Sequence, residues 1–185
     1  MQAHDFILII SATNRPNSST LRVARRVERH YRDAQIGCDL LNLEDLPPDL
    51  FRPQAYAAKP AEFLPLQQKI LDAAGMHVVL PEYNGSFPGV LKYFIDLLKF
   101  PESFDRKPAA FVGVSAGTWG ALRAVEQLQM VFGYRNAHLY PERVFIPGVS
   151  QKYPSEGTVT DVDLDERLRR QAAGFAEFCG LFRRK

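Results

Sequence analysis

Short apolar runs alternate along this chain with longer stretches of mixed character. The runs cover residues 6–10, 38–43, 78–80 with their flanks, and 109–114, and a weaker fifth run covers 143–146. They lack alternation between apolar and polar positions, which is typical of strands that are buried on both faces. The pattern therefore predicts a sheet that helices cover on both sides.

The stretches between these runs place apolar residues three and four positions apart, which predicts amphipathic helices. Strands that alternate with helices form parallel sheets. We therefore predict a single domain over residues 1–185, a flavodoxin-like α/β/α sandwich with a five-stranded parallel sheet in the order 2-1-3-4-5. The inward positions expected in the helices are Leu21, Ala24, Val27 and Tyr31, then Leu64, Gln67, Ile70, Leu71 and Ala74, then Val90, Phe94, Leu97 and Leu98, then Leu122, Val125, Leu128 and Phe132, with a last helix over about 163–182.

The segment from residue 47 to residue 65 is rich in proline and contains the aromatic residues Phe51, Tyr56 and Phe63. We expect a structured connection between the second strand and the second helix. It could form a wall beside a site or a contact between subunits.

Composition and charge narrow the functional classes. The chain is 46% hydrophobic and 24% charged, as in typical globular proteins, and its formal net charge is only +2. The basic residues are dispersed apart from the tail at 183–185, so nucleic acid is not expected as a partner. Two cysteines suit a reducing cytoplasm, and we expect neither a signal peptide nor a membrane span.

The segment SATNRPNSST, residues 11–20, joins the first strand to the first helix. Ligands of open parallel sheets bind at the carboxyl ends of the strands, and a helix N-terminus there favours an anion. The segment has neither GxxxxGK[ST] nor GxGxxG, so it suits a single terminal phosphate, as in FMN. The alternative is that a serine or threonine only caps the helix. The candidate ligands are Ser11, Thr13, Arg15, Ser18, Ser19 and Thr20.

A second stretch, PEYNGSFPGVLKYFIDLL, covers residues 81–98. Asn84 and Gly85 predict a turn after the third strand, Ser86 could cap the next helix, and Pro88 would suit its first turn. Backbone groups of residues 82–85 would then face the crevice, where a flat ring such as isoalloxazine needs fixed amides. The alternative is an ordinary loop whose aromatic residues belong to the core.

These two stretches resemble the phosphate loop and the PEYNxSxPGxLKNxID signature of the NAD(P)H-dependent FMN reductase family. A third stretch, residues 112–141, is similar to the family's fourth strand and helix, so the resemblance spans nearly the whole chain. By position, the resemblance implies that Thr13, Arg15, Ser18, Ser19 and Thr20 hold the FMN phosphate, that Pro81, Glu82, Tyr83, Asn84 and Gly85 line the ring and ribityl chain, and that Ser115, Gly117 and Thr118 lie on the other side.

The resemblance also implies an activity. Electrons would pass from NADPH or NADH through FMN to a small acceptor, such as a quinone, an azo compound or a flavin, by ping-pong hydride transfer. Flavin supplies this chemistry, so we expect no catalytic side chain and no metal. The family further implies a homodimer or homotetramer with the helix after the PEYN loop near the interface. The alternative function is a flavin-binding electron carrier or redox sensor without nicotinamide turnover.

The chain departs from the family's pattern at three positions. Ala12 and Ala121 stand where relatives commonly have glycine, and Tyr93 replaces the usual asparagine. We expect Ala12 to affect the approach of the backbone to FMN and Tyr93 to reshape a subunit contact or a substrate pocket.

Other polar residues are expected to have structural or solvated roles. The scattered histidines form no metal-ligand pattern, and Ser115 lacks the GxSxG context of a hydrolase nucleophile. We read the acidic run at 161–166 as a solvated helix start, and Glu126 and Gln127 as residues of the polar face of the fourth helix.

Overall fold

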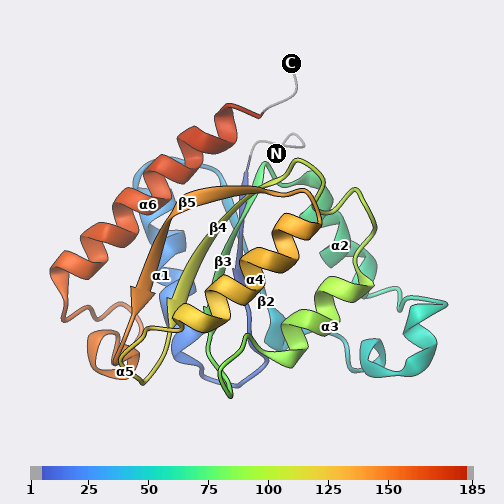
Figure 1. Cartoon of the computed structure of the whole chain (residues 1–185), viewed down its shortest axis with the longest axis horizontal. Coiled ribbons are helices and arrows are strands. Elements are labelled where there is room, and N and C mark those ends of the chain that lie inside the picture. The colour runs from blue at the N-terminus through green and yellow to red at the C-terminus, as the bar shows by residue number, and fades with distance from the viewer. Residues whose placement is uncertain (1–5, 183–185) are drawn as a thin grey trace.

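Five parallel strands form the middle layer of the molecule (Figure 1). In this computed structural model, which describes residues 6–182, their order is β2-β1-β3-β4-β5, which confirms the prediction. The basic tail at 183–185 lies outside the described residues. The strands are β1 (Ile7–Ser11), β2 (Cys38–Asn42), β3 (Gly75–Pro81), β4 (Pro108–Val114) and β5 (His138–Ile146).

The burial of the strands explains the uniform hydrophobicity of the sequence. Every residue of β1, β3 and β4 is buried, because these strands lie inside the sheet with helices on both faces. The edge strand β5 is only partly buried, and its first half contains His138 and Glu142. The apolar run at 143–146 therefore predicted only the second half of this strand.

Helices cover the sheet on both faces (Figure 1). Helices α1 and α6 pack on one face, and α2, α3 and α4 pack on the other. The prediction omitted α5 and three short 3-10 helices. The helices are α1 (Ser19–Asp33), η1 (Leu43–Asp45), η2 (Pro48–Phe51), η3 (Pro53–Tyr56), α2 (Phe63–Asp72), α3 (Gly89–Leu97), α4 (Leu122–Tyr134), α5 (Val149–Lys152) and α6 (Val162–Gly180).

The inward face of α2 differs from the prediction. Leu64 is 50% exposed, whereas Phe63 is fully buried. The buried positions of this helix are Phe63, Gln67 and Ile70, which are spaced by four and three residues. Because successive residues of a helix are rotated by about 100° around its axis, a helix that packs Phe63 and Ile70 on the core turns Leu64 toward solvent.

The connection between β2 and α2 is structured, as expected. Its 3-10 helices η2 and η3 contact α3, and Tyr93 of α3 donates a hydrogen bond to the carbonyl of Leu50 at 2.8 Å. The Tyr93 ring stacks on Phe51 with 5.4 Å between centroids, and Tyr56 meets it edge-on. Phe51 and Tyr56 are 44% and 57% exposed, so this aromatic cluster reaches the surface.

The strand order brings three connections to one edge of the sheet. Strand β3 pairs with β1 on one side and with β4 on the other, and all three run in the same direction. Their carboxyl ends therefore lie side by side, followed by the loops at residues 12–18, 82–88 and 115–121. We name these segments the β1 loop, the β3 loop and the β4 loop.

Candidate functional site

Unpaired hydrogen-bond donors gather at the start of α1. Ser18 caps the helix, since its Oγ accepts from the Leu21 N–H at 3.1 Å, as the alternative interpretation expected. The N–H groups of Ser19 and Thr20 lie in the first turn, where a helix offers no internal acceptor. Within the described residues they find no other acceptor, so they are available to an anion at the positive end of the helix dipole.

Ser11 adds a buried hydroxyl beneath this helix start. Its side chain is fully buried, and its Oγ has no hydrogen-bond partner among the described residues. Ile7 and Ile9 belong to the core on the α1 and α6 face, so the alternation of β1 directs Ser11 to the same face. A buried hydroxyl without a partner is costly in a folded protein, and a bound phosphate oxygen would supply the missing partner.

The β1 loop and the β3 loop contact each other through Tyr83. The hydroxyls of Thr13 and Tyr83 are 2.9 Å apart, and Thr13 also accepts from the backbone N–H of Arg15. The Arg15 guanidinium carbon lies 4.2 Å from the centroid of the Tyr83 ring. Arg15 is exposed, and its guanidinium has no hydrogen bond or ion pair within the described residues. Its N–H donors are thus free for a ligand.

The predicted turn in the β3 loop is confirmed. Tyr83 and Ser86 exchange backbone hydrogen bonds of 2.9 and 3.1 Å around Asn84 and Gly85, whose φ angles are 52° and 77°. Two successive left-handed residues define the tight turn of type I′. A Cβ at Gly85 would have nothing within 4 Å, so the backbone conformation alone favours glycine there.

Ser86 does not cap α3, contrary to the prediction. The residue preceding the helix is Pro88, and the Ser86 hydroxyl donates instead to Gln127 Oε1 of α4 at 2.6 Å. Gln127 Nε2 in turn donates to the carbonyl of Gly85 at 3.1 Å. The interpretation of Gln127 as only a polar-face residue was therefore incomplete, because periodicity does not reveal which loop a polar face meets.

A second side chain of α4 binds the start of the same loop. Arg123 donates to Glu82 Oε1 at 3.0 Å, and the other carboxylate oxygen of Glu82 is buried without a partner in the described part of the chain. This contact turns the Glu82 side chain toward α4.

The β4 loop completes the edge. The Ser115 hydroxyl donates to the carbonyl of Gly117 at 2.8 Å, and Gly117 and Thr118 are exposed. A Cβ at Gly113 would lie only 2.4 Å from the Gly120 carbonyl oxygen, so glycine at 113 lets the loop fold back over β4. A hollow of about 360 Å³ adjoins this loop and is lined by Thr118, Trp119, Phe145, Pro147, Lys152, Asp161, Asp163, Leu164 and Arg167.

The structure shows the surroundings of Ala12 and the backbone conformation of Ala121, two residues that stand where relatives commonly have glycine. Ala12 is fully buried, and its side chain belongs to the core on the face of α2, α3 and α4. Ala121 precedes α4 with a φ of 70°, a conformation that favours glycine. The methyl group of Ala12 thus packs away from the start of α1, on the opposite face from Ser11.

The acidic start of α6 is not simply solvated. Asp161 caps the helix by accepting from the Leu164 N–H, and Asp165 is buried. Asp165 accepts 2.8 and 2.5 Å hydrogen bonds from Arg26 and a 3.1 Å bond from His30. Burial alone would raise the pKa of Asp165, but these hydrogen bonds outweigh it and hold the pKa below its usual value. This carboxylate joins α6 to α1.

His77 of β3 is a structural histidine in the core. Gln171 uses its amide nitrogen to donate to two backbone carbonyls, so its Oε1 accepts from His77 Nε2 at 3.2 Å. His77 Nδ1 then accepts from the Tyr31 hydroxyl at 2.7 Å. Burial lowers the pKa of His77 to about 4, so the imidazole is neutral at physiological pH.

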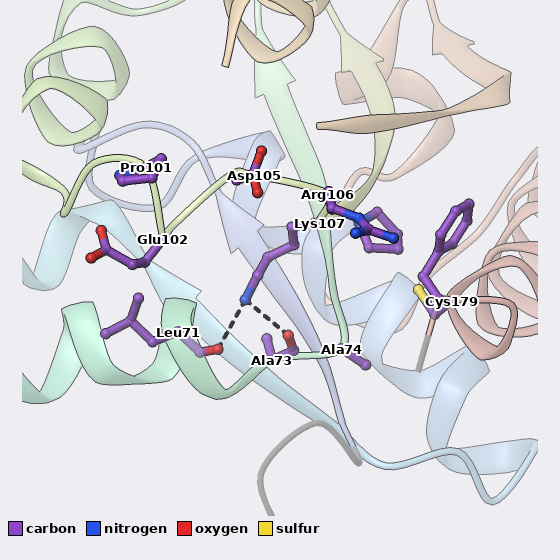
Figure 2. A pocket seen from close by; sticks show the side chains of 11 residues that line it. Leu71, Ala73, Ala74, Pro101, Glu102, Asp105, Arg106, Lys107 and Cys179 are labelled. Atoms are coloured by element: carbon purple, nitrogen blue, oxygen red, sulfur yellow. Dashed lines mark hydrogen bonds between the residues drawn. The ribbon is translucent and has the colours of Figure 1, made fainter. Parts of the chain in front are cut away.

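A cavity of about 490 Å³ lies at the opposite edge of the sheet, beside the amino ends of β3 and β4. Figure 2 shows Lys107 pointing from this cavity's wall to the carbonyls of Leu71 and Ala73, each at 3.0 Å, and the ammonium also contacts the Ile70 carbonyl. Burial lowers the pKa of Lys107 to about 8. Because its three donors cap the end of α2, Lys107 has a structural role.

The hydrogen-bond donors beside the carboxyl ends of β1, β3 and β4 fit FMN. A phosphate would meet the free donors around the start of α1, and the backbone of the β3 loop would border a planar ring. Among the described residues there is no group of three or more His, Cys, Asp or Glu side chains arranged to hold a metal. Nor is any described helix long and apolar enough to span a membrane.

Comparison with known proteins identifies the family. The family model for NADPH-dependent FMN reductase matches residues 6–151. The NADH:(hydroxy)cinnamate reductase subunit CrdA of Vibrio ruber is 30% identical over 170 residues, which cover 88% of this chain and 83% of that protein. A quinone reductase of Escherichia coli K12 is 33% identical over 123 residues, covering 64% of this chain and 65% of that protein.

The fold has a solved counterpart. FerB, a flavoenzyme NAD(P)H:(acceptor) oxidoreductase from Paracoccus denitrificans, superposes with a TM-score of 0.81 at 24% identity, covering 96% of this chain and 98% of that chain. The chain belongs to the NADPH-dependent FMN reductase family. It is accordingly a flavin-dependent NAD(P)H oxidoreductase with FMN as cofactor and a reduced nicotinamide as co-substrate.

Proposed function

We propose that this reductase holds FMN across the β1, β3 and β4 loops and passes electrons from NAD(P)H to a small quinone-like acceptor. The phosphate would bind at the start of α1, and the ring would extend along the β3 loop toward the β4 loop. The residues proposed to contact the cofactor are Ser11, Thr13, Arg15, Ser18, Ser19, Thr20, Pro81, Glu82, Tyr83, Asn84, Gly85, Ser115, Gly117 and Thr118.

The observation that carries this proposal is that several donors in and beside the β1 loop have no acceptor within the described residues. The buried hydroxyl of Ser11, the free N–H groups of Ser19 and Thr20, and the guanidinium of Arg15 all come from the β1 loop or its borders. A phosphate dianion would satisfy all of them, and charge-assisted hydrogen bonds are the strong ones. The contact between Arg15 and Tyr83 supports a cofactor that reaches from one loop to the next.

The residues of this site would bind and orient, and none of them would need to transfer a proton. FMN, when bound, supplies the redox chemistry that accepts a hydride from NAD(P)H and passes electrons on. The backbone N–H groups of the β3 loop would stabilise negative charge along one edge of the ring. The exposed residues Asn84, Gly117 and Thr118 would leave the opposite face open to nicotinamide and acceptor in succession.

A quinone is the acceptor class that we favour. Relatives named quinone reductase and 2-hydroxy-1,4-benzoquinone reductase support this choice, and a planar acceptor would stack on an exposed flavin ring. We propose that the acceptor is a small molecule, and that neither nucleic acid nor a membrane is a partner. The modest net charge of +2 supports this view, and the low cysteine content supports a cytoplasmic location.

The test is anaerobic turnover with purified protein reconstituted with FMN. We expect NADH or NADPH to be oxidised in an amount equal to the bound FMN without an acceptor, and continuously, with formation of the hydroquinone, when a benzoquinone is added. Bound flavin without nicotinamide oxidation would instead support an electron carrier. Failure of the protein to retain FMN would refute the site itself.

We also propose that the protein is a homodimer or homotetramer. The aromatic cluster of Phe51, Tyr56 and Tyr93 on the flank of α3 offers apolar surface next to the helix that follows the β3 loop. Light scattering after size-exclusion chromatography should give a multiple of 20.9 kDa, and Tyr56→Glu should shift the protein toward monomer. A wild-type mass equal to one chain would refute this proposal.

A further inference from the structure

Helix α4 reaches the β3 loop through two side chains. Arg123 and Gln127 are one helical turn apart, so they lie on the same face of α4. Arg123 contacts the Glu82 carboxylate at 3.0 Å, and Gln127 contacts both Gly85 and Ser86. The loop proposed to border the flavin ring is therefore held at its first residue and at its turn from a helix that begins about forty residues later in the chain.

The two hydrogen-bond partners of the Gln127 amide fix its orientation at the turn. The Gly85 carbonyl can only accept, so it faces the Nε2 donors, which leaves Oε1 to accept from the Ser86 hydroxyl. One side chain thus satisfies a carbonyl and a hydroxyl on two successive residues. These are the residues at the end of the left-handed turn, where Asn84 and Gly85 have φ angles of 52° and 77°.

Contacts from outside the turn stabilise a left-handed conformation of this kind. Left-handed residues are strained unless the surroundings hold them, and loops at binding sites belong to the less stable parts of a fold. The hydrogen bonds between Tyr83 and Ser86 close the turn, but they do not fix it against the rest of the protein. The contacts from α4 supply that fixation.

We infer that Gln127 is a positioning residue that holds the β3 loop in its flavin-binding conformation before the cofactor arrives. This inference rests on the proposed flavin site. Gln127 acts through Gly85 and Ser86, so its loss raises the Kd for FMN and loosens the loop in the apoprotein. A rigid loop binds more tightly because less conformational freedom is lost on binding.

The test compares Gln127→Ala with Gln129→Ala as the matched control. Gln129 lies on the same helix and bonds to Arg143 at 3.3 Å, away from the loop. We expect Gln127→Ala to raise the Kd for FMN about tenfold, the size expected from two hydrogen bonds, and Gln129→Ala to leave it unchanged. Gln127→Glu keeps the acceptor for Ser86 but sets a carboxylate oxygen against the Gly85 carbonyl, so it should raise the Kd at least as much as Gln127→Ala.

Two further measurements separate positioning from general stability. In the apoprotein, exchange of the Ser86 amide, which donates to the Tyr83 carbonyl, should become about tenfold faster in Gln127→Ala. Ser86→Ala combined with Gln127→Ala should raise the Kd no further than Gln127→Ala alone, because the two residues share one interaction.

Unchanged FMN affinity and unchanged exchange in Gln127→Ala would overturn the inference, as would additive effects in the double variant. Arg15→Ala tests the site independently. If Arg15→Ala weakens FMN binding and Gln127→Ala does not, the positioning role fails and the site stands. If FMN affinity survives Arg15→Ala, the proposed site itself fails.

Discussion

The guanidinium of Arg15 lies over the ring of Tyr83, with 4.2 Å between its central carbon and the ring centroid. The two residues are 68 positions apart in the chain, and each follows a different strand of the sheet. This contact joins the end of the site proposed to bind phosphate to the end proposed to border the ring.

Arg15→Ala should weaken FMN binding without destabilising the fold. The side chain is exposed, and within residues 6–182 its guanidinium lies on the Tyr83 ring without a hydrogen bond or ion pair, so its loss should change the free energy of unfolding by less than about 1 kcal/mol. Losing a charged donor to phosphate should raise the Kd for FMN by about tenfold to a hundredfold, measured by flavin fluorescence. Arg29→Ala, at the far end of α1, is the control and should bind FMN normally. Equal affinity in both variants would contradict the phosphate role of Arg15.

Ser11→Ala should separate cofactor binding from folding. The hydroxyl is buried and has no partner in the part of the chain that the structure describes, so its removal should leave the apoprotein as stable as the wild type or up to about 1 kcal/mol more stable. FMN affinity should nevertheless fall severalfold. Chemical unfolding of the apoprotein and FMN titration provide the two measurements. A destabilised apoprotein with normal FMN affinity would mean that Ser11 has only a structural role.

Gly113→Ala should displace the β4 loop. An added Cβ would lie 2.4 Å from the Gly120 carbonyl oxygen, and backbone on that side cannot move without shifting the loop. Overpacking of this kind costs about 1 to 3 kcal/mol, which thermal and chemical unfolding would detect. Gly117→Ala is the matched control, because a Cβ there meets nothing within 4 Å. Equal stability of the two variants would show that the approach of β4 to its loop tolerates a side chain.

Stability should fall as the pH is lowered from about 6.5 to about 4, the pKa values of His77 in the unfolded and folded chain. In this interval the unfolded chain binds a proton that the buried imidazole does not, so protonation favours unfolding. The full effect of this group is about 3 kcal/mol. Urea unfolding at pH 7, 5.5 and 4.5 would measure it.

His77→Gln provides the comparison for this pH dependence. The variant should show a shallower slope between the same pH values, although burial also lowers the pKa of His30, which adds in the same direction. An identical slope in the two proteins would assign the acid sensitivity to other groups.

Much of the site follows from local sequence. Ser18 occupies the capping position that its residue type favours, and Asn84–Gly85 forms the turn that its composition predicts. These features depend on neighbours only a few residues away. The phase of α2 was predicted wrongly, because two adjacent apolar residues, Phe63 and Leu64, could each lead the buried face, and only the packing of α2 on the core selects Phe63.

The sequence alone determined that uniformly apolar strands alternate with amphipathic helices, and hence which loops would meet at one edge of a parallel sheet. The tertiary structure decided that Arg15 lies on Tyr83, that Ser86 binds Gln127 instead of capping α3, and that Asp165 is buried against Arg26. The physical reason is that periodicity records which face of a helix is buried, since burial requires apolar side chains. What a polar side chain meets depends on the packing of segments that are far apart in the chain, and a single sequence does not encode that locally.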